Sequence, residues 1–395
     1  MKTMWIISEL FPPDETSTAF ILGEIANVMS HKYEVKVICG PEVYDKRKKA
    51  DLNSLFVLDQ QIKVTHVMGV GLDKNSLFGK AMRFLVISRQ LYKTAKRSIK
   101  EDDKVLLVTN PAVAVLLISR LKKRKKFELN ILVHDVFPEN MSPAGLRLPG
   151  IVFRILKKLF DKAYSRADQL IALGRDMKQV LERKIERYEH HPKVVIIENW
   201  ADLDIISPVK QRPCAEGIVL EYAGNIGRVQ GLQTVLEDIN TANNNKLFFH
   251  LWGTGAEEQN LKDYVQNHEM ENVVFHGAYL RSKQNEVLNN CDLALVTLAE
   301  GMFGLGVPSK TYNIMAAGKA VLFIGDTNSE IGLLVKEKQI GYVFDAINRN
   351  EIVRFLSGLS IEKRSELEEM GQRARKVAET EYAKDIILNK YVVAI

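Results

Sequence analysis

Residues 306–321 read GVPSKTYNIMAAGKAV, and this stretch decides how the second half of the chain folds. A glycine and Pro308 signal a turn, a helical pattern begins after Ser309, and another glycine ends it. Apolar runs on both sides predict buried strands, so the turn follows the carboxyl end of a strand. Ser309 is expected to cap the helix. Lys310 in the first turn opposes the helix dipole by roughly 0.3–1 kcal/mol, which favours an anion beside it. The alternative is an exposed lysine that tolerates its position.

Short apolar runs alternate with helical patterns along the whole chain. In the first half the predicted strands are residues 3–8, 33–39, 104–110, 128–135 and 168–173. In the second half they are residues 217–226, 246–255, 272–278, 291–298, 319–325 and 341–344. This alternation predicts an α/β protein with two doubly wound, Rossmann-like domains that face each other across a cleft. Ligands of such sheets bind at the carboxyl ends of the strands.

The length of 395 residues exceeds that of one ordinary domain. Residues 197–217 are rich in proline and polar side chains and form the predicted linker. We therefore predict an N-terminal domain over 1–205 and a C-terminal domain over 206–377. A last helix, 378–395, is expected to pack back on the first domain.

The composition is ordinary for a soluble globular protein, with 46% hydrophobic and 26% charged residues. Cys39, Cys214 and Cys291 lie far apart without metal-ligand spacing, which favours reduced thiols in the cytoplasm and no metal site. Glu9 interrupts the first apolar run, which indicates a strand rather than a signal peptide. No stretch is apolar over the roughly eighteen residues that a transmembrane helix needs.

Positive charge is concentrated in the first half of the chain. Residues 1–200 hold 35 Lys and Arg against 23 Asp and Glu, a balance of +12. The remainder holds 20 against 26, a balance of −6, and the two sum to the net charge of +6. The excess lies in three basic stretches, residues 77–100, 120–126 and 148–164. In the last stretch, one helical side is predicted to carry Arg154, Lys157, Lys158 and Lys162.

Three basic amphipathic stretches fit an anionic membrane surface, because each nearby cation contributes about 1 kcal/mol of attraction to anionic lipid. The alternative for any single one is a helix that packs on the core and exposes a charged face to water. Nucleic acid is not expected as a partner, since no nucleic-acid-binding module is visible. We expect a cytoplasmic protein, attached peripherally to the inner face of the cytoplasmic membrane.

A second glycine-rich turn ends the predicted strand 217–226. It contains Gly224, Asn225, Gly227 and Arg228 and leads into a helical pattern. Glycines at such a turn let backbone amides approach a phosphate, and an arginine adds a charged donor. The spacing is not that of a dinucleotide-binding turn, and the alternative is a tight turn that needs positive φ angles.

Polar residues also gather at the predicted carboxyl ends of the first sheet. His134 and Asp135 end the strand predicted at 128–135. The pair is suited to orient a hydroxyl group or to act as a base. The structural alternative is that Asp135 caps the next turn. The first strand-to-helix loop offers Glu15 and Thr16 to the same cleft.

These motifs together resemble the retaining glycosyltransferases of family 4, which have the GT-B fold. Within this family, the motifs are most similar to those of bacterial capsule and O-antigen transferases of the N-acetyl-L-fucosamine-transferase type. The resemblance covers almost the whole chain, through VHDVFPE, IIENWAD, YAGNIGRVQGLQTVL, LWGTGAEEQNL, NVVFHGAYL and GVPSKTYNIMAAGKAV. It implies metal-independent transfer of a sugar, without a cofactor, from a nucleotide-diphosphate sugar, commonly a UDP sugar. The implied acceptor is a membrane-linked saccharide of capsule, O-antigen or exopolysaccharide synthesis.

The resemblance also implies roles for individual residues. Arg228 and Lys310 match the cations that hold the donor diphosphate, and Asp135 completes the implied catalytic set. The implied acceptor side, in the first domain, consists of Glu15, Thr16, His134 and Asp135. The implied donor site, in the second domain, consists of Gly224, Asn225, Gly227, Arg228, Gly277, Ala278, Tyr279, Pro308, Ser309, Lys310 and Asn313.

Two positions depart from the family pattern. Where family members carry a pair of glutamates, this chain has Leu305 and Asn313. Asn313 is expected to bond the ribose in place of a carboxylate, and Lys310 to compensate for a lysine that many members carry elsewhere. The departures leave a catalytically inactive nucleotide-sugar-binding protein as an alternative. A sugar-nucleotide 2-epimerase, which shares the architecture and uses acids in the cleft, is another.

Overall fold

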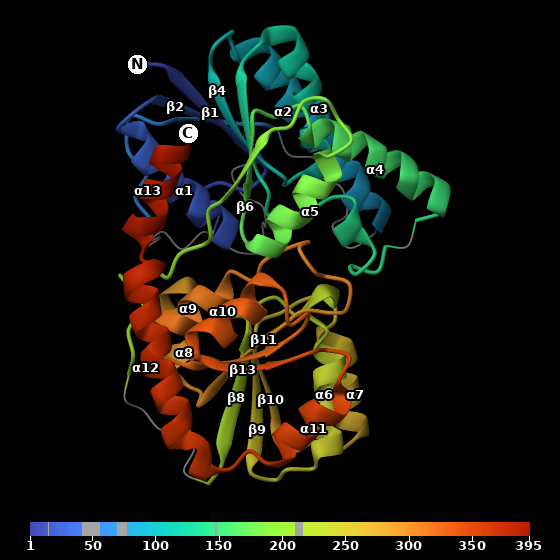
Figure 1. Cartoon of the computed structure of the whole chain (residues 1–395), viewed down its shortest axis with the longest axis vertical. Coiled ribbons are helices and arrows are strands. Elements are labelled where there is room, and N and C mark those ends of the chain that lie inside the picture. Colours follow the sequence, from blue (N-terminus) through green and yellow to red (C-terminus); the bar gives the residue numbers. More distant parts are fainter. Residues whose placement is uncertain (15, 42–55, 69–76, 147, 210–215) are drawn as a thin grey trace.

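The computed structural model describes residues 1–14, 16–41, 56–68, 77–146, 148–209 and 216–395. They form two lobes, one above the other in Figure 1, and each lobe surrounds its own parallel sheet. The strand order is β3-β2-β1-β4-β5-β6-β7 in the first lobe and β10-β9-β8-β11-β12-β13 in the second. Both orders reverse beside the first strand of the lobe, as in doubly wound sheets. The predicted α/β class is confirmed.

The helices and strands alternate along the chain. The first lobe contains β1 (Thr3–Ser8), α1 (Ser17–Ser30), β2 (Glu34–Cys39), β3 (Lys63–His66), α2 (Leu77–Ser98), β4 (Lys104–Val108), α3 (Ala112–Lys125), β5 (Glu128–Leu132), α4 (Gly150–Tyr164), β6 (Gln169–Ala172), α5 (Arg175–Ile185) and β7 (Lys193–Ile196). The second contains β8 (Ile218–Ala223), α6 (Leu232–Ala242), β9 (Leu247–Trp252), α7 (Glu258–Asn267), β10 (Val273–Gly277), α8 (Gln284–Asn289), β11 (Leu293–Thr297), α9 (Lys310–Ala316), β12 (Ala320–Ile324), α10 (Glu330–Lys338), β13 (Gly341–Phe344) and α11 (Arg349–Ser357). The chain ends with α12 (Arg364–Glu381) and α13 (Lys384–Ala394).

The predicted strands all match observed ones, with ends that differ by three residues at most. The agreement follows from burial, because helices cover both faces of each sheet and a central strand such as β12 is apolar and buried throughout. The sequence does not predict β3 and β7. β3 lies at one sheet edge and is largely exposed, so it lacks an apolar run, and β7 lies at the other edge and is only partly buried.

The described helices include none that is long and apolar enough to cross a membrane. α4 instead carries exposed apolar side chains, among them Ile151 at 66% and Ile155 at 54% exposure. Lys157, which the sequence places on the cationic side of this helix, is 38% exposed and pairs with two acids. Its Nζ lies 3.0 Å from Asp161 and 3.2 Å from Glu139, because a buried carboxylate such as that of Asp161 requires a counter-charge.

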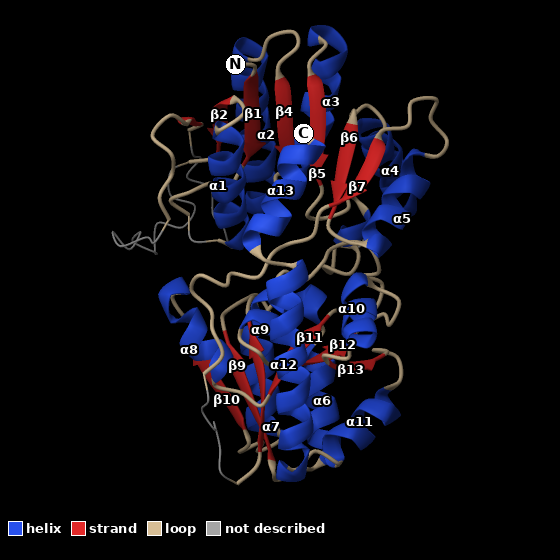
Figure 2. Cartoon of the chain, turned by 60° about the vertical axis from the view of Figure 1, so that its left-hand side comes forward, coloured by secondary structure: helices blue, strands red, loops and turns tan. Residues whose placement is uncertain are grey.

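The two C-terminal helices connect the lobes. α12 packs on α9 and β12 of the second lobe, whereas α13 packs on α1 of the first (Figure 2). The chain crosses between them at Tyr382, whose carbonyl accepts a hydrogen bond from the backbone N–H of Ala201 at 2.8 Å. At the last residue, the Ile395 carbonyl accepts from the Tyr33 hydroxyl at 2.9 Å. The predicted start of a separate last helix at residue 378 falls within α12, and the domain boundaries stay predictions.

We predict that Gly371→Ala destabilises the second lobe. A Cβ at this position in α12 would lie 2.1 Å from the carbonyl oxygen of Gly318, where the helix crosses the end of α9. Overpacking against backbone costs about 1–3 kcal/mol, more than alanine gains as a helix former. Urea denaturation measures the change. Gly358→Ala is the control, because a Cβ there meets its nearest atom at 3.5 Å. Equal stability of the two variants would contradict the packing argument.

Candidate functional site

A cleft of about 380 Å³ lies between the lobes, at the carboxyl ends of the strands. The predicted site residues that line it are His134, Asp135, Gly224, Asn225, Tyr279, Pro308, Ser309, Lys310 and Asn313. The predicted residues outside its lining are Thr16, Gly227, Arg228, Gly277 and Ala278. Glu15 lies outside the residues that the structure describes. Most of the predicted donor and acceptor groups therefore share one cleft, and Arg228 is the main exception.

Lys310, the first residue of α9, has the least compensated charge in the cleft. Its Nζ lies 3.4 Å from the centroid of the Tyr222 ring and has no hydrogen-bond partner among the described residues, although it is buried. Burial lowers the pKa of Lys310 well below its ordinary value, because the charged form loses its hydration. The aromatic ring compensates for only part of that loss. This is the arrangement of a cation prepared for an anionic ligand.

Gly224 provides the room for this ammonium group. It has a φ of +150°, and a Cβ there would lie 2.9 Å from the Lys310 Nζ. The backbone conformation therefore favours glycine, and the close approach shows that the Lys310 amine fills the space beside it. The glycine-rich turn was predicted to bind a phosphate, and in the structure it packs against the Lys310 amine.

The prediction that Ser309 caps α9 is wrong. Ser309 is the residue before the helix, but its side chain makes no capping hydrogen bond. Its φ of −62° and ψ of −24° are already helical, whereas a capping serine has extended backbone that directs its hydroxyl to the free N–H groups. The Thr311 hydroxyl instead donates to the Pro308 carbonyl at 3.0 Å.

Arg228 lies at the rim of the cleft and is paired with an acid. Its Nε donates to the Glu257 carboxylate at 2.9 Å, and its side chain is 53% exposed. The guanidinium also reaches the first lobe, since a Cβ at Gly145 would lie 2.7 Å from its Nη1. The structure therefore does not place the two predicted cations together in the lining of the cleft.

His134 and Asp135 lie at the carboxyl end of β5, and their pKa values are shifted in opposite directions. Burial lowers the pKa of His134 to about 4, so its ring is neutral at pH 7, and its Nε2 has no partner among the described residues. Burial raises the pKa of Asp135 to about 6, and a hydrogen bond from Asn140 opposes part of that rise. Both shifts have the same cause, which is that burial disfavours the charged form.

The backbone of this segment joins the two lobes. Asp135 forms an antiparallel bridge with Gly306, and the N–H of Val136 donates to the carbonyl of Leu305 at 3.0 Å. The Leu305 side chain is buried at 6% exposure. The acid of the first lobe is therefore fixed directly against the turn that delivers Lys310.

Asn313 takes part in a second contact between the lobes. Its Oδ1 accepts from the backbone N–H of Asp202 at 3.0 Å. The Asp202 carboxylate holds Arg281 at 2.6 Å, and that guanidinium lies 3.7 Å from the ring centroid of Phe20. The sequence analysis missed these three cleft residues, because their contacts join distant positions. The segment IIENWAD, which contains Asp202, was the available signal.

Aromatic rings support the loop that follows β10. Gly277 has a φ of +77°, and the neighbouring His276 ring stacks on Trp252 with centroids 4.0 Å apart. Tyr279 meets Trp252 edge to face at 6.2 Å and lines the cleft. Behind this loop, burial raises the pKa of Glu221 to about 8. Sequence reasoning did not single out Glu221, since it lies within an otherwise apolar strand.

The chain has recognisable relatives. Residues 205–377 match the family described as glycosyl transferases group 1. The chain is 33% identical over 337 residues to the probable glycosyltransferase WbjE of Pseudomonas aeruginosa, across 82% of each protein. It is 25% identical over 202 residues to WcaI of Escherichia coli, whose name places it in colanic acid biosynthesis, across 48% of this chain and 49% of WcaI.

The solved structure of HepE from Anabaena in complex with UDP has the same architecture. It matches 100% of this chain and 99% of its own, with a TM-score of 0.69 and 14% sequence identity. Identity this low speaks for the fold alone, whereas the match to WbjE extends through both lobes. The chain therefore belongs to the glycosyl transferases group 1 family of glycosyltransferases, and its two-lobed architecture is the GT-B fold.

Proposed function

We propose that this chain transfers a sugar, with retention, from a UDP sugar to a membrane-linked saccharide in capsule, O-antigen or exopolysaccharide synthesis. The observation that carries the proposal is the buried Nζ of Lys310 in the cleft, which has no hydrogen-bond partner in the described part of the chain. The name of WcaI and the UDP bound to HepE support the process and the nucleotide. The N-acetyl-L-fucosamine-transferase type is the finer form of the same proposal.

The proposed chemistry uses Lys310 to stabilise the leaving group. As the bond between the anomeric carbon and the diphosphate stretches, negative charge grows on the diphosphate. A fixed cation then stabilises the transition state more than the ground state, and no divalent metal is required for this purpose. The acceptor hydroxyl attacks from the face that the diphosphate leaves, and its proton passes to the departing phosphate oxygen. The sugar keeps its anomeric configuration.

Arg228 is the second cation of this proposal. Its pair with Glu257 is half exposed, and such a pair contributes only about 0–1 kcal/mol. The guanidinium can therefore exchange Glu257 for the diphosphate at small cost. Gly227, Gly277 and Ala278 stay predicted donor contacts, although they lie outside the lining of the cleft.

Asp135 and His134 form the proposed acceptor side. Asp135 lies against Gly306 of the turn that carries Lys310, so it faces the position at which the sugar would join the diphosphate. Its ionised form would stabilise the positive charge that develops on the sugar ring. The neutral ring of His134 can hydrogen-bond an acceptor hydroxyl without adding charge.

We predict that UDP binding takes up a proton at Lys310. Burial depresses the pKa of the free site, and the diphosphate restores it, so between the two pKa values the affinity for UDP falls as pH rises. Calorimetry in buffers of different ionisation enthalpy measures the uptake. Lys310→Ala is expected to abolish it and to lower kcat by about 10²–10³-fold. Lys246→Ala, which removes an exposed lysine of the same lobe, should change neither. Near-normal kcat in Lys310→Ala would refute the proposal.

A second prediction concerns the pH dependence of transfer. Because the raised pKa of Asp135 is about 6, its ionised form is lost as pH falls through that value, and kcat/KM should decline below about pH 6. Asp135→Asn should lower kcat/KM by about 10²-fold at pH 7.5 and remove this acid limb. If kcat/KM of the variant still declines below about pH 6, the decline is caused by a group other than Asp135.

The proposal also includes attachment to an anionic membrane through α4. Ile151, Val152 and Ile155 are exposed on this helix, beside the exposed cations Arg154, Lys158 and Lys162. Apolar side chains that enter the lipid and cations that meet the headgroups act together in such helices. The attachment would place the acceptor side of the cleft near a lipid-linked saccharide.

We predict that Ile151→Asp/Ile155→Asp reduces co-sedimentation with phosphatidylglycerol vesicles by at least about tenfold, because each lost apolar contact removes about 1.5–3 kcal/mol. Ile347→Asp is the matched control, since Ile347 is 67% exposed on the second lobe and Ile151 is 66% exposed. Equal sedimentation of the double variant and the control would exclude α4 as the attachment surface.

A further inference from the structure

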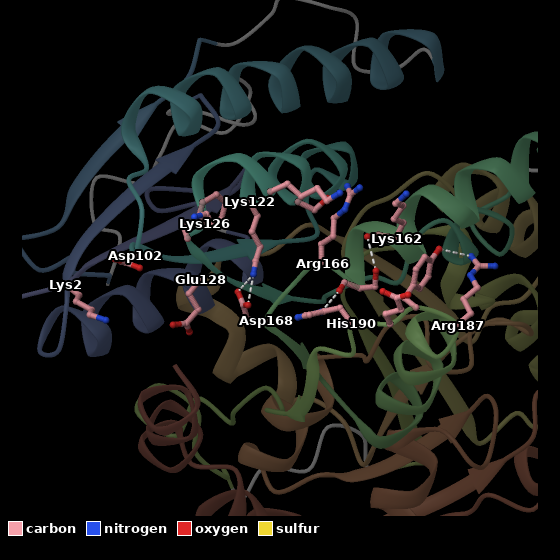
Figure 3. Close-up of a pocket in the computed structure, with 16 residues that line it drawn as sticks. Lys2, Asp102, Lys122, Lys126, Glu128, Lys162, Arg166, Asp168, Arg187 and His190 are labelled. Atoms are coloured by element: carbon pink, nitrogen blue, oxygen red, sulfur yellow. Dashed lines mark hydrogen bonds and ion pairs between the residues drawn. The ribbon is translucent and has the colours of Figure 1, made fainter.

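A second cavity, of about 910 Å³, lies in the first lobe (Figure 3). The residues that line it include several at the amino ends of strands, namely Lys2, Asp102, Glu128, Asp168 and His190. The cleft described above lies at the carboxyl ends of the same strands. Because the two ends of a strand are separated by the thickness of the lobe, this cavity is not part of the proposed transferase site.

The lining of this cavity is predominantly cationic. Its basic residues are Lys2, Lys122, Lys123, Lys126, Lys162, Arg166 and Arg187, and its acidic residues are Asp102, Glu128, Asp168 and Glu189. Two of these acids are already engaged. The Asp168 carboxylate accepts from Lys122 at 2.5 and 2.6 Å, and Glu128 accepts from Lys104 at 3.0 Å. Lys126 and Arg187 pair with acids outside the lining, Glu101 at 3.9 Å and Asp161 at 2.8 Å, so the uncompensated charge lies on the other cations.

The charge is least compensated between the C-terminal ends of α3 and α4. Among the described residues, no acid pairs with Arg120, Lys162 or Arg166 within 4.0 Å. Burial lowers the pKa of Arg166, and the neighbouring Arg120 lowers it further. A helix C-terminus favours cations, but it does not explain two guanidinium groups that repel each other without an acid between them.

A smaller hollow of about 110 Å³ continues the cavity at this point and shares Ser119, Lys162 and Arg166 with it. Its floor is apolar and consists of Leu116, Leu159 and Ala163, and Arg120 completes its rim. Figure 3 shows the nitrogens of Lys162 and Arg166 on the same side of the cavity, away from Asp168. Cations from two helices thus converge above a small apolar floor.

We propose that Arg120, Lys162 and Arg166 form a binding site for a phosphate-bearing anion, supplied either by the headgroup of an anionic lipid or by a free diphosphate. Guanidinium groups bind phosphate oxygens through paired, charge-assisted hydrogen bonds, and an anion between two of them removes their mutual repulsion. Lys162 lies on the same exposed side of α4 as Ile155 and Lys158, so a headgroup here is compatible with α4 at a membrane. The site does not depend on sugar transfer.

The test compares Arg120→Gln/Arg166→Gln with a charge-matched control, Arg183→Gln/Arg354→Gln, which removes two exposed arginines. One arm measures the affinity for inorganic diphosphate by calorimetry, with Lys310→Ala in every chain so that the cleft does not contribute. We expect a loss of at least tenfold in the site variant and none in the control. The other arm measures sedimentation with phosphatidylglycerol and phosphatidylcholine vesicles, without the Lys310 change.

The two arms identify the source of the anion. A loss of diphosphate binding alone identifies a free phosphate ligand, and a loss of phosphatidylglycerol binding, with or without it, identifies a lipid headgroup. Diphosphate and vesicle binding equal to the control in both arms would overturn the proposal. The UDP affinity of the site variant should equal that of the wild type, which separates this outcome from a failure at Lys310. Its melting temperature should not fall, since neither arginine forms an ion pair with any residue that the structure describes.

Discussion

The buried charge of Lys310 constrains the whole second-lobe wall of the cleft. A buried ammonium group is costly in a protein interior, so its surroundings must leave it space and a favourable surface. The centroid of the Tyr222 ring lies 3.4 Å from the Lys310 Nζ. Gly224 leaves space for the amine because it has no side chain. Tyr222 and Gly224 lie at the carboxyl end of β8, and the lysine begins α9, the helix that follows β11. The parallel order of the sheet, in which β8 and β11 are neighbours, brings them together.

Contacts between the lobes bring the first lobe to this cation. The bridge between Asp135 and Gly306 is made by backbone atoms, so it fixes position without depending on side-chain rotamers. A second link is ionic, since the Arg175 side chain at the start of α5 holds the Glu330 carboxylate at 3.0 Å. The acid, the turn and the lysine therefore act as one unit as long as the lobes remain in contact.

The sequence predicts the parts of the protein that depend on local pattern. A fully buried strand such as β12 is apolar from end to end, and the GVPSK turn has glycine, proline and lysine at adjacent positions, so both are visible without a structure. Their order along the chain was enough for the two-sheet fold. The position of the cleft was predictable because parallel α/β sheets bind ligands at the carboxyl ends of their strands.

Long-range pairing was not predictable in the same way. The partners Asp202 and Asn313 are 111 positions apart, and Arg228 and Glu257 are 29 apart. The buried Asp161 carboxylate pairs with Lys184 and Arg187, 23 and 26 positions away, and the helical pattern alone cannot show which acid is buried. Ser309 has the residue type of a helix cap but not its backbone angles, which only the structure reveals.

The paired crossings of the chain have a mechanical consequence. The linker and the junction between α12 and α13 are the two covalent connections between the lobes, and a parallel bridge between Ala201 and Ala383 holds them side by side. Two connections fastened at one place leave a single pivot. Any relative rotation of the lobes would have to turn about that junction, which lies next to Asp202 in the sequence.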